Sequence, residues 1–331
     1  MKSLVRCVCE AAGRGESVVI ATVVESSGST PRTSGAKMIV RADGSIEGTV
    51  GGGLVEAASC KAGCEMLKAG HPDGAARLMF VDMTQELAAS SDMICGGGLS
   101  VLLEVAAPDG SCAEAYGMLD DLLRRGRKAV LSTSLEEGEA LVSVRHEVRC
   151  DSLLGEPLRL LREGDAMTLE EAMTPPQPLY IFGAGHVSLF TARVGSMIGF
   201  RTVVLDDRAD FASRERFPEA DEVVVLPSFD KCCDGLDIDG DSFVVIVTRG
   251  HLHDRNVLAK VLRTKAGYVG MIGSSKKRDK IYESLLADGF TQADIDRCHC
   301  PIGLSIGGQT PEEIAVSIAA ELIQVRAEGR A

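Results

Sequence analysis

The pattern of apolar and polar positions changes near the middle of this 331-residue chain. From Leu179 onward, short apolar runs alternate regularly with segments of helical spacing. The pattern predicts strands and helices as follows: strands at 179–183, 202–206, 222–226, 243–248 and 268–272, and helices at 186–198, 253–263, 276–286 and 311–325. Near-continuous apolar strands between helices indicate a parallel sheet covered on both faces. We therefore predict a Rossmann-like, doubly wound α/β domain over residues 179–331.

The first half of the chain has a mixed pattern with several β-branched runs. An Asp-Gly step at Asp43-Gly44 is typical of a hairpin. Further elements are predicted as follows: strands at 18–25, 36–41, 45–50, 77–82, 99–105, 129–134 and 140–145, and helices at 54–69 and 113–125. Clustered strands with few helices favour an α+β domain with a mainly antiparallel sheet over residues 1–172. Three prolines in residues 173–178 cannot continue a helix or a central strand, so this segment is predicted to be the linker.

Composition and charge narrow the classes of function. The formal net charge of −13 opposes DNA or RNA binding, which needs a positive face, so no nucleic-acid partner is expected. No apolar run approaches the length of a membrane helix, and the first residues lack a secretory apolar core, so we expect a cytoplasmic protein without membrane contact. The 11 cysteines are an odd number and are expected to be reduced. None has the paired C-x2-C spacing, so zinc is not expected.

A nucleotide-binding turn is predicted where the first strand of the second domain meets its helix, at Gly183-Ala184-Gly185-His186-Val187-Ser188. Gly183 permits the tight turn, Gly185 lets the backbone approach a pyrophosphate, and the helix N-terminus stabilises the negative charge. Asp206 ends the next strand at about the ~20-residue interval at which a ribose hydroxyl is bound. Ser188 replaces the third glycine and is still small. The alternative is a Rossmann turn that binds nothing.

Several polar residues follow the other predicted parallel strands, whose carboxyl ends carry ligand sites in such folds. They are His186, Asp206, Asp207, Arg249, His251, Gly273 and Ser274. His251 and His253 are candidate acid–base groups or metal ligands, while His253 and Asp254 are equally candidates for a helix cap. The run Ser274-Ser275-Lys276-Lys277 is a candidate phosphate site, or else a capped helix start with solvated charges.

Glycine clusters in the first domain give further candidates. Gly28, Ser29 and Arg32 offer backbone N–H groups, a hydroxyl and a guanidinium for an anion. Gly51, Gly52 and Gly53 precede a helix containing Glu56 and suit close approach of a ligand. Cys95, followed by three glycines, is a candidate to ligate a soft metal or to carry sulfur; the alternative is a small buried side chain.

Taken together, these motifs resemble the xanthine dehydrogenase accessory proteins of the XdhC and CoxF type. The resemblance rests on the following segments of both domains: 28–32, 48–53 with Glu56, 95–97, 183–187, 206–208, Thr248-Arg249 with His251 and Asp254, 268–274, 301–304 and 310–315. It implies a chaperone, rather than a catalyst, that binds molybdenum cofactor (molybdopterin or its dinucleotide). It also implies that the protein promotes sulfuration of the cofactor with a cysteine desulfurase, inserts it into a molybdenum hydroxylase client, and forms a cytoplasmic homodimer.

The resemblance assigns the glycine clusters, the Rossmann turn and the polar residues above to cofactor binding, and no residue to catalysis. Many members carry a Cys-Cys-Gly-Gly form, but Ile94 stands at the first cysteine here, which leaves Cys95 as the candidate molybdenum contact. Two other functions stay open. One is an NAD(P)-dependent oxidoreductase with His186 or His251 as proton donor, and the other is a nucleotide- or redox-sensing scaffold without catalysis.

Overall fold

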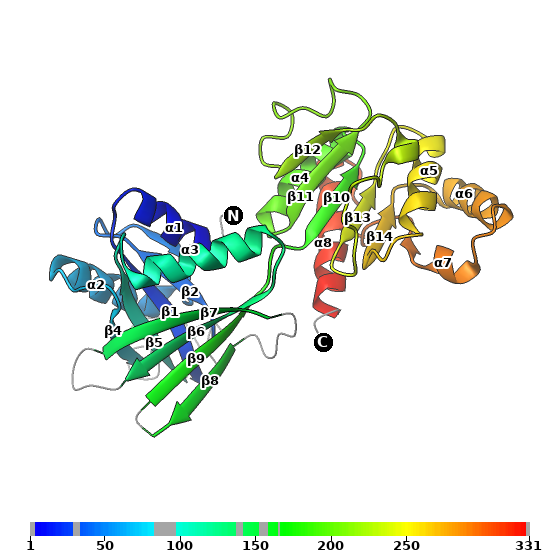
Figure 1. Cartoon of the computed structure of the whole chain (residues 1–331). Helices are drawn as coiled ribbons and strands as arrows, with labels where there is room; N and C mark the ends of the chain where they lie inside the picture. Colours follow the sequence, from blue (N-terminus) through cyan, green and yellow to red (C-terminus); the bar gives the residue numbers. More distant parts are fainter. Residues whose placement is uncertain are drawn as a thin grey trace. The chain divides into compact units, whose positions relative to one another are not determined.

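The computed structural model describes residues 4–28, 34–82, 97–136, 142–151, 158–164 and 166–328. The chain divides into two compact units, one ending at Pro175 and the other starting at Pro176 (Figure 1). This point lies within residues 173–178, the segment that the sequence predicts to be the linker. Over the residues searched, which are the described ones, no helix has the length and apolar character needed to cross a bilayer.

The N-terminal unit is built on one antiparallel sheet. Its elements in chain order are α1 (Leu4–Gly13), β1 (Val18–Gly28), β2 (Lys37–Val40), β3 (Ile46–Gly48), α2 (Gly53–Lys68), β4 (Ala75–Asp82), β5 (Gly97–Ala106), α3 (Ser111–Arg124), β6 (Ala129–Glu136), β7 (Val142–Cys150), β8 (Leu158–Glu163) and β9 (Ala166–Met173). The strand order is β3-β2-β1-β5-β4-β7-β6-β9-β8, and every described pairing is antiparallel. The predicted α+β fold is confirmed.

Successive side chains along each strand point to opposite faces of this sheet, and the two faces pack against different helices. On β1, Val19, Ala21 and Val23 pack with residues of α2, whereas Ile20 packs with α1 and α3 on the opposite face. The helix α1 and the strands β8 and β9 are absent from the sequence prediction. Charged residues interrupt the apolar runs of both strands, as in Leu158–Glu163, so the expected strand signal is weak there.

The C-terminal unit is a six-stranded parallel sheet. Its elements are β10 (Pro178–Phe182), α4 (His186–Met197), β11 (Arg201–Asp206), β12 (Glu222–Val225), the 3-10 helix η1 (Phe229–Lys231), β13 (Phe243–Ile246), α5 (His251–Val261), β14 (Tyr268–Met271), α6 (Ser275–Ala287), α7 (Gln292–Asp296), β15 (Cys298–His299) and α8 (Pro311–Glu328). The order β12-β11-β10-β13-β14-β15 is the 3-2-1-4-5-6 order of a Rossmann sheet. The predicted doubly wound fold is confirmed.

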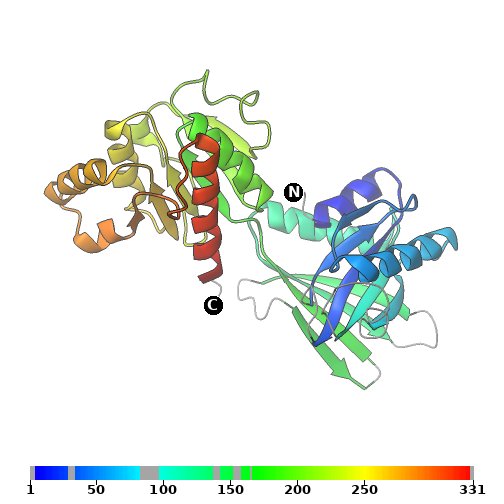
Figure 2. The same ribbon diagram turned by 180° about the vertical axis from the view of Figure 1, so that it is seen from behind.

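Helices cover both faces of the parallel sheet. One apolar cluster joins the sheet to α4 and α8, and another joins it to α5 and α6. Figure 2 shows α8 in red beside α4 in green, and these two helices contact each other along their length. The turn that follows β10 and the turns that follow β13 and β14 open at the same edge of this sheet, because all three strands are parallel.

Candidate cofactor-binding site

The turn between β10 and α4 has the backbone that the glycine motif predicts. Gly183 has a φ of 108°, and a Cβ there would lie 2.4 Å from the carbonyl oxygen of Val247. Gly185 is the N-cap of α4, and no atom lies within 4 Å of where its Cβ would stand. Ser188 is completely buried, so the third position of the motif needs a small side chain here. The turn therefore presents open backbone at a helix N-terminus.

Asp206, which the sequence predicts to accept from a ribose hydroxyl, has protein partners on both carboxylate oxygens. Its side chain is buried, and Ala184 N–H donates to Oδ2 at 2.8 Å. Arg208 donates to both carboxylate oxygens from its side chain, at 2.8 and 2.9 Å, and to Oδ1 from its backbone at 3.0 Å. Burial opposes ionisation, but the hydrogen bonds from Arg208 and Ala184 hold the pKa of Asp206 below its usual value. The carboxylate thus fixes the glycine turn, and its acceptor positions are filled.

The next carboxylate, Asp207, is more accessible. Arg249, which follows β13, donates to Asp207 Oδ2 at 2.8 Å. The side chains of Arg249 and Asp207 are 43% and 18% exposed, so this pair can open to a ligand at modest cost. The two predicted residues are therefore brought together at the carboxyl edge of the sheet.

A second buried carboxylate organises the next two turns. Asp254 in α5 is completely buried and accepts hydrogen bonds from the backbone and hydroxyl of Thr248, at 3.0 and 2.6 Å. Lys277 in α6 forms an ion pair with Asp254 and also donates to the carbonyl of Ile272 at 3.2 Å. These contacts tie the N-termini of α5 and α6 to the ends of β13 and β14.

Between these two helix N-termini lies a pocket with a volume of about 580 Å³. We call it the basic pocket, and it is lined by Gly250, Leu252, Arg255, Ser274, Lys276, Lys277, Lys280, Ile281 and Ser284. None of these lining residues is acidic. Arg255 pairs with Asp288, and Lys277 with Asp254, whereas Lys276 and Lys280 are exposed and form no ion pair within the described residues.

The electrostatics of the basic pocket suit an anion. The positive ends of the α5 and α6 dipoles meet there, and Ser274 caps α6 by accepting from Lys277 N–H at 3.3 Å. Ser274 therefore has the capping role that the sequence left open, at the rim of a cationic pocket. Gly273 stands next to it, and a Cβ there would crowd the Lys277 side chain at 3.2 Å.

The three candidate histidines of this edge differ in their surroundings. His186 is exposed at the first residue of α4. His253 packs against Phe229, with ring centroids 5.0 Å apart, which gives it a packing role. His251 is the first residue of α5, and its side chain lies outside the described part of the structure.

In the N-terminal unit, the glycine loop before α2 is organised by two side chains. Gly51, Gly52 and Gly53 all have positive φ, at 131°, 79° and 53°. Glu56 Oε1 accepts from Gly52 N–H at 2.9 Å and from the hydroxyl of Thr49, and Thr49 accepts from Gly51 N–H at 3.2 Å. Glu56 thus holds the loop in shape.

Of the remaining candidates of this unit, Gly28 lies within the described residues. Gly28, the last residue of β1, pairs with Gly97, the first residue of β5. Ser29, Arg32 and Cys95, whose roles the sequence predicts, lie outside the described residues.

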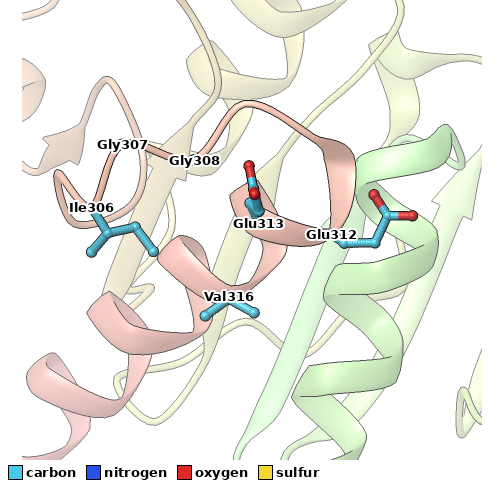
Figure 3. A pocket seen from close by; sticks show the side chains of 6 residues that line it. All are labelled: Ile306, Gly307, Gly308, Glu312, Glu313 and Val316. Atoms are coloured by element: carbon cyan, nitrogen blue, oxygen red, sulfur yellow. The ribbon is translucent and has the colours of Figure 1, made fainter.

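A smaller hollow of about 300 Å³ lies at the N-terminus of α8 (Figure 3). Its lining includes Ile306, Val316 and two glutamates, Glu312 and Glu313. Glu313 accepts from the backbone N–H groups of Gln309 and Thr310 at 2.7 and 3.1 Å, and these bonds lower its pKa. A hollow with this negative charge is a poor site for a phosphate, unlike the basic pocket.

Comparison with known proteins decides the family. A model described as the XdhC Rossmann domain matches residues 179–322, and a model described as the XdhC and CoxI family matches residues 11–80. The chain belongs to the XdhC and CoxI family. The first match spans β10 to β15 and most of α8, and the second includes the glycine loop with Glu56.

Relatives of this XdhC-family chain include three named proteins. The uncharacterized protein YqeB of Escherichia coli (strain K12) is 29% identical over 93% of the chain, but the chain spans only 43% of YqeB. A relative from Bacillus subtilis (strain 168), named as a probable xanthine dehydrogenase subunit, is 26% identical, with 94% of each covered. The molybdenum cofactor insertion chaperone PaoD of E. coli (strain K12) is 24% identical, covering 98% of this chain and 88% of PaoD.

A solved structure has the same fold. A crystal structure from Bacillus halodurans, described as a xanthine dehydrogenase, is 27% identical and superposes with a TM-score of 0.79. The match covers 99% of this XdhC-family chain and 96% of the other.

Sequence reasoning missed part of the basic pocket. Arg255, Lys280 and Ser284 are absent from the predicted set, although they line the pocket. A signal for two of them was present, since Lys276, Lys280 and Ser284 recur at intervals of four residues and so share one face of a helix.

Proposed function

We propose that this chain is a maturation factor that binds molybdenum cofactor and assists its insertion into a xanthine dehydrogenase-type molybdenum hydroxylase. The basic pocket is the observation that carries the proposal. A phosphate-bearing cofactor needs a local positive site, and this pocket concentrates cations in a chain whose net charge is −13. The names of PaoD and of the B. subtilis relative support the role, because they refer to cofactor insertion and to xanthine dehydrogenase.

The basic pocket would hold the phosphate end of the cofactor. Its volume of about 580 Å³ is within the range of roughly 300–1,000 Å³ that small-molecule sites have. The N-termini of α5 and α6 supply backbone N–H groups, and Lys276 and Lys280 supply unpaired charges. Gly185 and the opening Asp207–Arg249 pair lie at the same sheet edge and would bind further polar groups of a dinucleotide form.

Further parts of the role rest on the family resemblance. Cys95 would contact the molybdenum or carry sulfur, with a cysteine desulfurase as the sulfur source. Gly28, Ser29, Arg32 and the loop shaped by Glu56 would bind polar groups of the cofactor. The proposal includes a cytoplasmic homodimer.

An NAD(P)-dependent oxidoreductase is the second candidate. The Rossmann strand order and the backbone of the Gly183–Gly185 turn favour it. The filled acceptor positions of Asp206 argue against ordinary placement of the adenosine ribose, because that residue's oxygens already bind Ala184 and Arg208.

The test is to purify the full chain from a molybdenum-replete host and to measure bound molybdenum and the fluorescent pterin oxidation product. The cofactor chaperone predicts both, in about equal amounts. The double variant Lys276→Ala/Lys280→Ala should bind the cofactor roughly tenfold more weakly or worse, because two charge-assisted contacts are lost. Lys265→Ala is the matched control, since Lys265 is exposed and lies just before β14, at the opposite end of that strand from the pocket.

Two results would overturn the proposal. One is a chain without molybdenum or pterin that instead enhances NADH fluorescence, which would establish the oxidoreductase. The other is that the double lysine variant and Cys95→Ala both bind the cofactor as strongly as the unaltered chain does. That result would show that neither proposed contact is made.

A further inference from the structure

A band of polar side chains crosses the interior of the N-terminal sheet, on the face covered by α1 and α3. On β5, Glu104 stands between Leu102 and Ala106, which belong to two separate apolar clusters. On β7, His146 likewise stands between Val144 and Val148. The band therefore interrupts an otherwise apolar interior, where each polar group needs a partner.

The sheet curls around this band. Lys37 on β2 forms an ion pair with Glu171 on β9 at 2.9 Å, although β1, β5, β4, β7 and β6 separate the two strands in the sheet. The two side chains are 9% and 5% exposed, and Lys37 also donates to Thr22 at 2.8 Å. The charges are thus enclosed within the unit.

Three potential metal ligands meet inside the curl. Glu104 Oε2 and His146 Nε2 are 3.1 Å apart, and their side chains are 2% and 1% exposed. Cys112 in α3 is completely buried, and one ligand atom from each of the three residues lies within 4.8 Å of the others. We propose that Glu104, Cys112 and His146 bind one thiophilic divalent transition-metal ion, with Zn²⁺ the best match to a sulfur, nitrogen and carboxylate donor set.

Two buried polar atoms at this place lack partners. His146 Nδ1 and the Tyr116 hydroxyl form no hydrogen bond within the described structure. The two rings also meet edge to face, with centroids 6.1 Å apart. An unsatisfied buried polar group is destabilising, and native interiors contain few. A bound ion would coordinate one ring nitrogen of His146 and would hold a water as its fourth ligand. The ion and this water would give partners to polar groups such as these.

The charge of the interior agrees with a bound cation. The band contains two carboxyl side chains, Glu104 and Glu171, and a single lysine, Lys37. A divalent ion with a Cys112 thiolate would add one net positive charge to this acidic band. Binding forms the sulfur–metal bond and releases one proton from the Cys112 thiol.

The sequence predicts no zinc site, because none of its cysteine pairs has the C-x2-C spacing. That criterion does not detect this cluster, whose donors come from β5, α3 and β7 and contain a single cysteine. The site belongs to the N-terminal unit and is independent of the basic pocket, so it stands or falls separately from the proposed function.

The test is cobalt substitution in the full chain. Metal is removed by dialysis against a chelator under reducing conditions, and Co²⁺ is titrated. The expected result is a thiolate-to-cobalt charge-transfer band that saturates at one ion per chain. Cys112→Ser should abolish the band, and His146→Asn should weaken binding at least about tenfold, as loss of a ligand does. The double variant Cys60→Ser/Cys64→Ser is the control, because those thiols lie one helical turn apart in α2 and should not contribute.

Zn²⁺ should also raise the melting temperature of the unaltered chain, and Glu104→Gln should remove that increase. The Glu104→Gln variant keeps the proposal testable if circular dichroism shows that Cys112→Ser does not fold. The proposal is wrong if the unaltered chain shows no thiolate band, or if the band persists in both Cys112→Ser and His146→Asn. It is also wrong if Zn²⁺ stabilises Glu104→Gln as much as the unaltered chain.

Discussion

The two sheets of this protein place their polar groups differently. In the parallel sheet, strands such as β13 and β14 are buried along their whole length, and the charged groups of the basic pocket stand beyond their carboxyl ends. In the antiparallel sheet, Lys37, Glu104 and Glu171 lie within strands and face the interior. The parallel sheet thus places these charged groups at one edge, whereas the antiparallel sheet holds charge in its core.

The difference follows from how each sheet is covered. Helices on both faces of a parallel sheet leave no room for solvated groups, so polar side chains gather where the strands end. A curled antiparallel sheet encloses a space of its own, in which charges can pair across many strands. Buried pairs seldom add stability over apolar residues of the same size, but removing one partner is costly. Such groups therefore point to a role other than packing.

The largest effect is expected from breaking the Lys37–Glu171 pair. Lys37→Met leaves the Glu171 carboxylate buried without its cation and should lower the free energy of unfolding by about 3–5 kcal/mol. Urea unfolding followed by circular dichroism measures the change. Lys37→Met/Glu171→Leu should recover most of the loss. If the double variant is as unstable as the single one, the interior charge is not what makes the single change costly.

A smaller effect is expected at the edge of the parallel sheet. Gly183→Ala forces a Cβ against the carbonyl of Val247 at positive φ and should cost about 1–3 kcal/mol. Gly185→Ala enters open space and should cost about 1 kcal/mol or less, while still obstructing a ligand. Thermal unfolding and cofactor binding, measured on both variants, separate the two roles. Equal losses of stability would contradict the geometry described for this turn.

The smallest effect concerns a polar pair between β15, at one edge of the parallel sheet, and α8. The hydrogen bond that His299 donates to the Glu321 carboxylate raises the pKa of His299. The stabilisation from this bond is present below the ordinary histidine value of 6.5 and is lost as the pH rises through the raised pKa. Burial opposes ionisation of Glu321, but the hydrogen bonds from His299 and Gly303 keep the pKa of Glu321 below its usual value of 4.5. The contribution of Glu321 to stability is therefore present above pH 4.5 and is lost as the pH falls through the lowered pKa. The pair should therefore contribute most to the stability of the fold between pH 4.5 and pH 6.5.

A double-mutant cycle with His299→Asn and Glu321→Gln measures this coupling. Because His299 is 43% exposed, the coupling should be below about 1 kcal/mol in mildly acidic buffer and should vanish in alkaline buffer. A coupling that does not change with pH would show that the pair acts without the charge on His299.

The sequence predicted the C-terminal fold well, because buried parallel strands and amphipathic helices have periods that differ clearly. It also located Gly183, Asp207 and Arg249, which stand where strands end. It did not reveal that the acceptor positions of Asp206 are filled, because that depends on where Arg208 folds back. It predicted less of the N-terminal unit, since β8 and β9 carry charges along their length. The sequence could not predict the cluster of Glu104, Cys112 and His146, because these residues meet only when β5 and β7 flank β4 in the sheet and α3 packs on it.

The order of the antiparallel sheet leaves two outer strands, β3 and β8, among those described. β3 has only three residues, and β8 carries Arg159, Arg162 and Glu163, all exposed. Short or charged outer strands are poor templates for strand addition from another molecule, and they protect a sheet against aggregation. A second copy of this chain is therefore expected to associate through helices or loops, not by extending the sheet.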